Sequence, residues 1–411
     1  MRVMRVVHVY DAYARQFYAR RPELAAQPFA EQLAAHNHQG YSNAGAWVHA
    51  LRPLGYEVLE VTANLLPMQR AWARENGLSD PENASAAEIV FAQARQFQPE
   101  VIWYDYNDAV LLKRLRTELK SVRLAIGWTG SALPTRNPWQ FVDVVLSCAP
   151  ESVELLRRMG KRAEHVHHGF DPTVNQRLIA REPTIPVSFV GQLVRHTRYH
   201  LNREEILLAL ADRIELSLFS PARAPSARDY LRAGVCGGLY GVVRCLSKVG
   251  LMEAATRRSA LARRVALAAS PPRLPVNPRL ARLIRPAVYG LEMYQTLRDS
   301  WVTLNIHAAS SPTYASNMRL FEGTGVGTCL LTDWKENLPT LFEPDREVVA
   351  YRSAEECAEK ARWLLDHPRE RNEIALRGQQ RVLREHTVAH RAGRIHEIIQ
   401  SLLCAGSRSL P

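Results

Sequence analysis

The sequence is poor in cysteine, and its cysteines lie far apart. Six cysteines are spread over 411 residues without a C-x2-C pair. This pattern argues against a zinc ribbon and against a disulfide framework, because both need cysteines at regular close spacing. The cysteine usage instead favours a reducing compartment.

Long hydrophobic runs are missing as well. No apolar run approaches the ~20 residues that span a bilayer. The run at the N-terminus is too short and too interrupted for a signal peptide. We therefore expect a soluble, cytoplasmic protein. A chain of 411 residues is too long for one compact core, so two domains are expected.

Acidic residues are scarce in one part of the chain. The sequence has 53 basic and 41 acidic residues, which gives a net charge of +12. Residues 221–290 contain thirteen Lys or Arg against two acidic residues, a net of +11. Nearly all of the excess therefore lies in one segment. Such an excess predicts a polyanionic partner: membrane phospholipid, nucleic acid or an acidic substrate.

The sequence does contain a regular alternation of short apolar runs and helical stretches. The apolar runs are typical of strands buried on both faces of a parallel sheet. The clearest are residues 3–9, 57–62, 101–104 and 187–190. This alternation predicts an α/β protein with doubly wound parallel sheets. In such sheets ligands bind beyond the carboxyl ends of the strands.

A motif near the C-terminus carries a family resemblance. Residues 317–322 read N-x-R-x-F-E, followed by a glycine, an apolar strand, T-D-W and later E-H-T-x2-H-R. This pattern, over roughly residues 300 to 395, resembles the C-terminal half of bacterial GT-B glycosyltransferases. The likeness is greatest to the group 1, spore-maturation-protein-like enzymes. The segments SFVGQL and HHGFD and a glycine loop near residue 40 follow the order of that family.

The resemblance implies the GT-B architecture. Two Rossmann-like domains face each other across a cleft, and a C-terminal helix crosses back to the first domain. The expected division is an acceptor-side domain at 1–170, a linker at 171–186, a nucleotide-sugar-binding domain at 187–388, and a C-terminal helix and tail at 389–411. The second domain contains the basic insertion, at about residues 221–287.

The resemblance also implies a role for Glu322. In these enzymes a Glu at this place accepts hydrogen bonds from both ribose hydroxyls of a nucleotide sugar, and one carboxylate can accept two O–H donors at once. Backbone N–H groups around Ser316 suit a diphosphate. Gly323, Gly325 and Gly327 would let a ligand or a neighbouring backbone come close. Capping or ion pairing near a helix end is the structural alternative for Glu322.

Two polar residues precede Glu322. Arg319, one turn earlier, could meet the pyrophosphate, orient the carboxylate or form a purely structural ion pair. Asn317 is either a helix N-cap or a direct contact to the sugar. Many related enzymes carry a second Glu eight residues before the ribose-binding one, and Tyr314 stands at that position here. A site with two glutamates is therefore not expected.

The leaving diphosphate needs positive charge, because the resemblance implies catalysis without a bound metal and no D-x-D motif follows a strand. The cations are expected after Gly191, where Arg195, Arg198 and Arg203 follow the strand. Arg203 is the first choice and Arg195 the second, since an Arg presents a fork matched to phosphate oxygens. Solvated arginines at a helix start are the alternative. No cofactor is expected beyond the nucleotide sugar as co-substrate.

The N-terminal half offers a loop for the donor phosphates or the acceptor. Its candidates are Gly40, Tyr41, Ser42 and Asn43. Many relatives have a His after a later strand, close to the transferred sugar. The corresponding stretch here is GWTGS, so Trp128, Thr129 or Ser131 takes its place, and the catalytic base stays unassigned. His386 and His390 lie four apart without a third ligand, which favours a structural role.

The basic insertion contains an amphipathic stretch. As a helix, residues 239–249 place Leu239, Val242, Val243, Leu246 and Val249 on one face. Arg244 and Lys248 fall opposite, which is the layout of an interfacial helix. The expected partner is anionic lipid on the inner face of the cell membrane, with a solvated helical hairpin as the alternative. Nucleic acid is not expected, because no binding motif is present.

Together these features predict a glycosyltransferase that moves a hexose or similar sugar from a nucleotide sugar to a glycan or lipid-linked acceptor, as in polysaccharide biosynthesis. Retention of configuration and independence from metal are expected from the resemblance. The alternatives are an inactive GT-B scaffold that binds nucleotide or glycan, and a sugar epimerase or phosphorylase of the same fold. The N-x-R-x-F-E motif argues against these alternatives.

Overall fold

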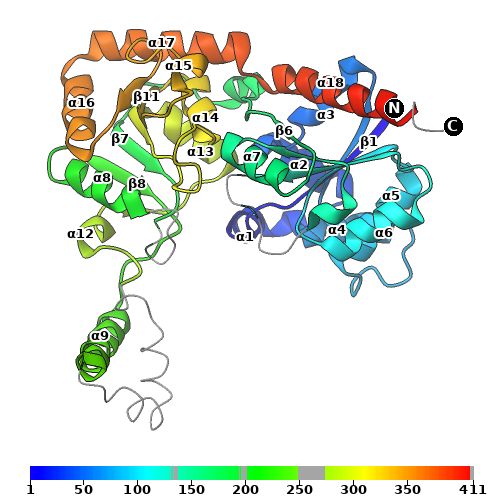
Figure 1. Cartoon of the computed structure of the whole chain (residues 1–411), viewed down its shortest axis with the longest axis horizontal. Helices are drawn as coiled ribbons and strands as arrows, with labels where there is room; N and C mark the ends of the chain where they lie inside the picture. The colour runs from blue at the N-terminus through cyan, green and yellow to red at the C-terminus, as the bar shows by residue number, and fades with distance from the viewer. Residues whose placement is uncertain (131–132, 134–137, 194, 196–200, 249–273, 408–411) are drawn as a thin grey trace.

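The chain was analysed as a computed structural model, which describes residues 1–130, 133, 138–193, 195, 201–248 and 274–407. Within these residues the chain forms two lobes, each built on one parallel sheet (Figure 1). The predicted α/β class with two doubly wound sheets is therefore confirmed. Arg198 and Ser131 lie outside the described residues.

The first sheet has the strand order β2-β1-β3-β4-β5-β6, and every described pair is parallel. Its strands are β1 (Arg2–Val7), β2 (Glu57–Thr62), β3 (Val101–Asp105), β4 (Leu124–Thr129), β5 (Val144–Ser147) and β6 (Ala163–His165). These runs are apolar on both faces because helices cover both sides of the sheet. The strand order reverses between β1 and β3, so the ligand crevice of this lobe is expected at their carboxyl ends.

Helices flank the first sheet. They are α1 (Asp11–Ala19), α2 (Phe29–Gln39), α3 (Ala46–Leu51), α4 (Leu66–Glu75), α5 (Ala86–Phe97), α6 (Ala109–Glu118) and α7 (Pro150–Arg158), with short 3-10 turns at Pro22–Ala26, Tyr41–Asn43, Arg52–Leu54 and Pro138–Phe141. One face of the sheet packs on α5 and α6, and the other packs on α3. Helix α3 is followed by a 3-10 turn, which Gly55 ends at φ 85°.

The second sheet has the order β12-β11-β10-β7-β8-β9, and its described pairs are also parallel. Its strands are β7 (Ile185–Val190), β8 (Leu216–Phe219), β9 (Ile284–Arg285), β10 (Ser300–Asn305), β11 (Cys329–Asp333) and β12 (Val349–Tyr351). Counted within its own half, this is the Rossmann order 3-2-1-4-5-6. Its switch point therefore lies between β7 and β10.

Helices also cover both faces of the second sheet. They are α8 (Leu201–Ala211), α12 (Pro278–Ala281), α13 (Gly290–Arg298), α14 (Arg319–Gly325), α15 (Leu338–Leu341), α16 (Ala354–Asp366) and α17 (Pro368–Glu385), with a 3-10 turn at Pro172–Arg177. Helices α8, α12 and α16 share one core with the sheet, and α13, α14 and α15 share the other.

The last helix, α18 (Val388–Ser407), returns to the first lobe (Figure 1). Its apolar residues Val388, Ile395 and Ile399 join the core formed by Trp103 and Ile126. The chain also crosses between lobes near Phe170, whose N–H donates to the carbonyl of His386 at 2.9 Å. The predicted return of the C-terminal helix to the N-terminal domain is confirmed.

The described part of the basic insertion forms the long helix α9 (Ala227–Lys248), which projects from the second lobe in Figure 1. Within it, Val243 is buried against Leu239 and Tyr240, whereas Val242 is 58% exposed. The apolar face predicted for 239–249 is therefore divided, and Val249 lies outside the described residues. No described helix is long and apolar enough to cross a membrane.

Candidate functional site

Glu322 lies in α14 with its carboxylate almost fully buried. The residue is 5% exposed, and Arg319 Nη1 donates to its Oε2 at 2.8 Å. The hydroxyl of Tyr294, on α13, donates to Oε1 at 3.4 Å. A carboxylate has about four acceptor positions. Two positions on Glu322 therefore remain for further hydroxyl donors.

The residues before α14 are held by the strand beside them. Asn317 Nδ2 donates to Asn305 Oδ1 at 2.6 Å, at the carboxyl end of β10. Met318 is the N-cap residue of α14, so Asn317 does not cap this helix. Ser316 is buried at 7% exposure. The structure thus places Ser316, Asn317, Arg319 and Glu322 in one continuous group.

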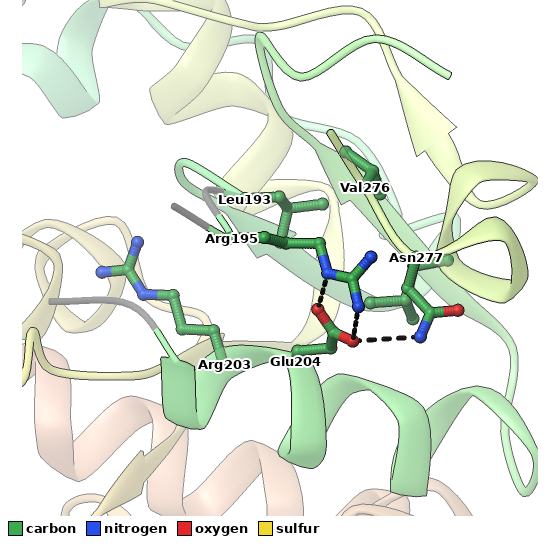
Figure 2. A pocket seen from close by; sticks show the side chains of 7 residues that line it. Leu193, Arg195, Arg203, Glu204, Val276 and Asn277 are labelled. Atoms are coloured by element: carbon green, nitrogen blue, oxygen red, sulfur yellow. Dashed lines mark hydrogen bonds and ion pairs between the residues drawn. The ribbon is translucent and has the colours of Figure 1, made fainter. Parts of the chain in front are cut away.

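The two candidate arginines point in different directions (Figure 2). Arg203 donates to the carbonyls of Gln192 and Ile306, at 2.9 and 3.2 Å. These carbonyls follow β7 and β10, so Arg203 spans the switch point next to Gly191. Arg195 instead forms an ion pair with Glu204 at 2.6 Å, and Asn277 donates to the same carboxylate at 3.0 Å.

The pKa of Arg203 is influenced by the charge of Arg319, a residue of the Glu322 group. Burial lowers the pKa of Arg203 to about 10, and the charge of Arg319 contributes to the lowering, whereas Asp333 and Tyr10 oppose it. Arg203 therefore stays protonated at neutral pH. The Nε atoms of Arg203 and Arg319 are buried without a hydrogen-bond partner among the described residues. Buried donors of this kind normally have partners, so both are suited to an anionic ligand.

The glycine loop of the first lobe faces this group. Gly40, Ser42, Asn43 and Gly45 have φ of 60°, 56°, 60° and 75°. Left-handed Ser42 is a strained conformation, and such strain gathers at ligand sites. Tyr41 stacks on Tyr13 with ring centroids 4.0 Å apart. Burial raises the pKa of Tyr41, and the charge of Glu322 contributes to the rise. The Tyr41 ring also contacts that of Tyr289, the N-cap residue of α13, with centroids 5.9 Å apart, so the loop meets the second lobe.

Two other candidates of the first lobe, Trp128 and Thr129, are the last residues of β4. Trp128 contacts the rings of Trp103 and His168, with centroids 6.3 and 5.6 Å away. Thr129 is buried at the end of β4. Asn43 donates from Nδ2 to the carbonyl of Gly169 at 3.2 Å, so it anchors the glycine loop to the crossover segment.

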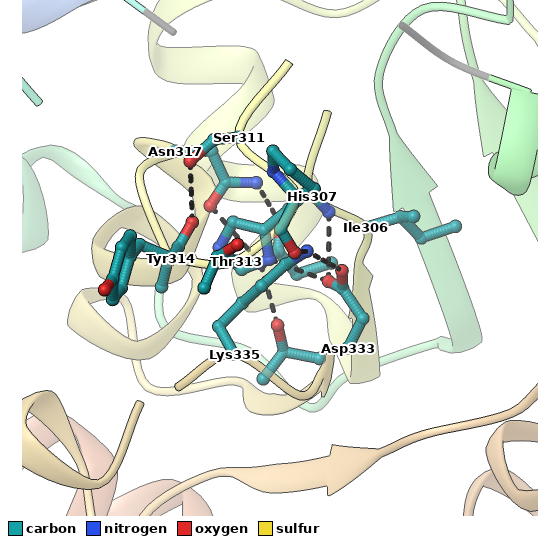
Figure 3. Close-up of polar contacts among 12 residues, drawn as sticks. Ile306, His307, Ser311, Thr313, Tyr314, Asn317, Asp333 and Lys335 are labelled. Carbon is teal, nitrogen blue, oxygen red and sulfur yellow. Dashed lines mark hydrogen bonds and ion pairs between the residues drawn. The ribbon is translucent and has the colours of Figure 1, made fainter. Parts of the chain in front are cut away.

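A second polar group lies at the carboxyl ends of β10 and β11 (Figure 3). His307 Nδ1 and Asp333 Oδ1 are 2.7 Å apart, and the His307 N–H donates to the same oxygen at 3.0 Å. Lys335 lies 3.3 Å from the other carboxylate oxygen. Burial would raise the pKa of Asp333, but His307 and Lys335 outweigh it and hold the pKa below its usual range. These residues line a cavity of about 540 Å³ together with Trp334 and Arg352.

A carboxylate of the first lobe holds the loop between β10 and α14. Glu151, in the first turn of α7, accepts from the backbone N–H groups of Thr313 and Tyr314 at 3.1 and 3.0 Å. It also accepts from the hydroxyl of Ser311 at 2.8 Å. Figure 3 shows these loop residues beside His307 and Asn317. The first lobe therefore contacts the loop that leads into the Glu322 group.

The glycines after Glu322 serve packing rather than ligand approach. A Cβ added at Gly325 would lie 2.5 Å from the Phe170 ring, and one at Gly323 would lie 2.7 Å from Leu330. Gly327 has φ of 86°, a conformation that favours glycine. The expected close approach is therefore made by neighbouring side chains of the protein.

Comparison with known proteins finds a family model that resembles part of the chain. A model described as glycosyl transferase-like matches residues 249–397, which is less than half of the chain and includes the Glu322 group. No curated protein sequence gives a match.

Solved structures match over nearly the whole length. The structure of Anabaena Alr3699/HepE in complex with UDP-glucose has a TM-score of 0.51 at 11% identity, covering 98% of this chain and 100% of that chain. The structure of its complex with UDP and glucose has a TM-score of 0.50 at 12% identity, with the same coverage of both chains. The chain has the GT-B fold. Sucrose-phosphate synthase from Thermosynechococcus elongatus gives 0.48 at 11% identity, covering 98% and 100% of the two chains.

Within this GT-B fold the structure brings together most of the donor-side candidates. Glu322, Arg319, Asn317, Ser316 and Arg203 meet at the carboxyl ends of β7 and β10, and Tyr41 reaches them from the first lobe. Arg195, Trp128 and Thr129 do not join this group, and their roles stay predictions.

Sequence reasoning missed Tyr294 and Glu151. Tyr294 belongs to the buried face of α13, and the sequence pattern predicts a core residue at such a position. Glu151 lies in the first turn of α7, where an acid is ordinary because it complements the helix dipole. Neither residue has a local signal, because each reaches its partner from another element.

Proposed function

We propose that this chain is a glycosyltransferase that transfers a sugar from a nucleotide sugar to a glycan or lipid-linked acceptor, as in polysaccharide biosynthesis. The observation that carries the proposal is the Glu322 carboxylate, buried where the two lobes meet and left with two acceptor positions. A pair of adjacent ribose hydroxyls supplies two O–H donors at the spacing one carboxylate accepts. The spore-maturation-protein-like subgroup is the part of the family we propose for it.

The diphosphate would lie between the two cationic side chains next to Glu322. Arg319 and Arg203 keep unpartnered Nε donors, and Arg203 spans the strand ends where phosphates bind in Rossmann sheets. Negative charge grows on the leaving diphosphate as the bond to the sugar breaks. Fixed guanidinium groups in a dry site stabilise that charge without reorganising.

Metal independence and retention of configuration are further parts of the proposal. The arginines take the role that a cation has in other sugar transfers. Turnover should therefore persist in EDTA, and the anomeric signal of the product by NMR should match that of the donor. A reaction that stops in EDTA and returns with Mg²⁺ would contradict the first claim, and an inverted product would contradict the second.

The test of donor binding is a thermal-shift panel of UDP, GDP, dTDP, CDP and ADP. UDP comes first, because HepE binds UDP and UDP-glucose. A ligand at 100 times its dissociation constant stabilises the folded state by about 2.7 kcal/mol. We expect one diphosphate to stabilise the wild type and to lose that effect in Glu322→Gln, which keeps the side-chain shape.

The control is Glu343→Gln, an exposed glutamate of the same lobe whose side chain is 54% exposed. It should respond to the nucleotide as the wild type does. If no diphosphate stabilises the wild type, the donor assignment fails. If binding is kept but donor turnover is absent with every acceptor, the inactive GT-B scaffold is the better description.

We also propose that α9 docks the enzyme on an anionic membrane. Leu231, Val235 and Val242 are 70%, 52% and 58% exposed, and their spacing of four and seven residues places them on one stripe of the helix. An exposed apolar stripe on a basic segment fits an interfacial helix. Each Lys or Arg near an anionic leaflet adds roughly 1 kcal/mol.

Co-sedimentation with vesicles tests the membrane proposal. The full chain should pellet with phosphatidylcholine vesicles that contain phosphatidylglycerol, and much less with phosphatidylcholine alone. Leu231→Glu should weaken pelleting, whereas Leu376→Glu on α17, also an exposed leucine at 55%, should not. Equal pelleting with both vesicle types, or equal effects of both variants, would remove the claim.

A further inference from the structure

Asp105 is a carboxylate that the donor site does not use. It is the last residue of β3, whose neighbours in the sheet are β1 and β4. The strand order reverses between β1 and β3, so Asp105 lies at the switch point of the first sheet. Groups at this place face bound ligands in doubly wound folds.

The side chain of Asp105 has no partner within the part of the chain that the structure describes. It is half-buried, and no hydrogen bond or ion pair joins it to any described residue. The nearest cation, Arg5, pairs with Glu60 at 2.5 Å and lies over the Trp103 ring at 4.8 Å. Burial raises the pKa of Asp105 to about 7, although Arg5 opposes the shift. A desolvated titratable group without a structural partner is a typical feature of a catalytic site.

Neighbouring residues place Asp105 on the side of the first lobe that faces the second. Burial raises the pKa of the Cys148 thiol to about 12, and the charges of Asp105 and Glu151 both contribute. Cys148 and Glu151 follow β5, which runs parallel to β4 and β3, so they lie at the same edge of the sheet as Asp105. Glu151 reaches the loop before α14, and α7 lies beside the second lobe in Figure 1. Asp105 thus lies at the sheet edge from which Glu151 of α7 reaches the second lobe.

We propose that Asp105 is the catalytic base that takes the proton of the acceptor hydroxyl. The inference rests on the proposed glycosyl transfer. As the acceptor oxygen bonds to the anomeric carbon, the bond from that carbon to the β-phosphate oxygen breaks. The electron pair leaves with the nucleoside diphosphate, and the hydroxyl proton passes to a carboxylate oxygen of Asp105.

The assignment does not depend on the anomeric outcome. The face from which the acceptor attacks is set by its position, whereas the proton goes to whichever base the hydroxyl contacts. The competing acceptor of the proton is the departing phosphate. The charged group that acts on the Asp105 carboxyl is Arg5, which is already paired with Glu60.

The experiment uses UDP-glucose as the probe donor and water as the acceptor, with UDP release as the readout. A base with a pKa near 7 acts when it is deprotonated, so the wild-type rate should rise through pH 7 and level off above it. Asp105→Asn should lower the rate at least 100-fold, in line with the size of general-base effects. The rate of Asp105→Asn should also no longer depend on pH. Asp105→Glu should restore part of the rate and part of its pH dependence.

Asp108→Asn is the matched control. Asp108 caps α6 by accepting from the N–H of Val110 and Leu111, and Asn caps a helix as well as Asp. Its rate and pH profile should equal those of the wild type. Asp105→Asn must still show the nucleotide-dependent thermal shift, which proves that the lobes are folded.

The outcomes separate the two proposals. If Asp105→Asn keeps the rate within threefold and the same pH profile, Asp105 is not the base and the departing phosphate takes the proton. If the wild type neither binds a nucleotide nor releases UDP, the proposed function itself has failed, and this assignment fails with it.

Discussion

Glu322 shows how one buried charge is stabilised by its surroundings. Burying a carboxylate is costly unless it is paired and hydrogen-bonded. Arg319, one turn earlier on α14, supplies the charge, and Tyr294 supplies a hydroxyl from another helix. The structure shows the ion pair between Arg319 and Glu322, and the pyrophosphate contact stays a prediction.

His36 supports the tyrosines next to the glycine loop. Its ring contacts the hydroxyls of Tyr13 and Thr62 at 2.9 and 3.2 Å. Burial lowers the pKa of His36 to about 4, although Glu60 opposes the shift. Because an unfolded His titrates near 6.5, only the unfolded chain gains a proton between pH 6.5 and 4. The stability that neutral His36 contributes is therefore complete above pH 6.5 and declines below it.

We expect His36→Gln to remove this part of the acid sensitivity. Between pH 7 and 5 the wild type should lose about 2 kcal/mol more unfolding free energy than the variant, from ~1.4 kcal/mol per pH unit below 6.5. Urea unfolding at both pH values measures it. His49→Gln, at an exposed histidine, should behave like the wild type. Parallel losses in wild type and His36→Gln would show that His36 does not titrate on unfolding.

At the scale of elements, a glycine lets α14 pack closely against the rest of the protein. The helix has seven residues, too few to be stable alone, so its orientation comes from packing. Gly325 lets the Phe170 ring lie against the helix, and Phe170 belongs to the crossover between the lobes. The position of Glu322 thus depends on contacts made by a segment 150 residues away in sequence.

Gly325→Ala should destabilise the protein by about 1–3 kcal/mol, the usual cost of overpacking a core. The reason is that the new Cβ would lie 2.5 Å from the Phe170 ring. Gly393 on α18 is the matched control, since nothing lies within 4 Å of a Cβ built there. Ala at that position should raise stability by up to ~1 kcal/mol through helix propensity. Denaturant unfolding that ranks the two variants in the opposite order would refute this account of α14.

At the scale of the whole molecule, the lobes are joined by two chain crossings and by side chains between them. The crossings touch where Phe170 pairs with Thr387, and a Cβ at Gly169 would lie 2.8 Å from the Thr387 backbone. Glu151 adds a contact on the other side, to the loop before α14. The arrangement of the lobes therefore bears directly on the order of the Glu322 group.

Glu151→Ala should release that loop. Without the carboxylate, the N–H groups of Thr313 and Tyr314 lose their acceptor, so their hydrogen exchange should speed up by tenfold or more, equal to about 1.4 kcal/mol of protection. Mass spectrometry of peptides that cover residues 311–315 measures the change. Glu154→Ala on the same helix removes only an exposed pair with Arg158 and should leave this exchange unchanged. Unaltered exchange in Glu151→Ala would mean that the loop is ordered by its own lobe.

The sequence by itself determined the class of the sheets and most strand positions, and it singled out Glu322 as a candidate. Strands buried on both faces are apolar throughout, and this periodicity is a local property that does not depend on distant partners. The resemblance carried by residues 317–322 is also local, and it predicted that Glu322 binds the nucleotide sugar.

Only the tertiary structure decided which side chains meet. Arg195 and Arg203 looked alike in sequence, yet Glu204 and Asn277 bind the first, and the ends of β7 and β10 bind the second. Glu151 gained significance from a loop far along the chain, and Asp105 from having no hydrogen-bond or ion-pair partner among the described residues. Side-chain direction depends on non-local packing, and no local pattern records it.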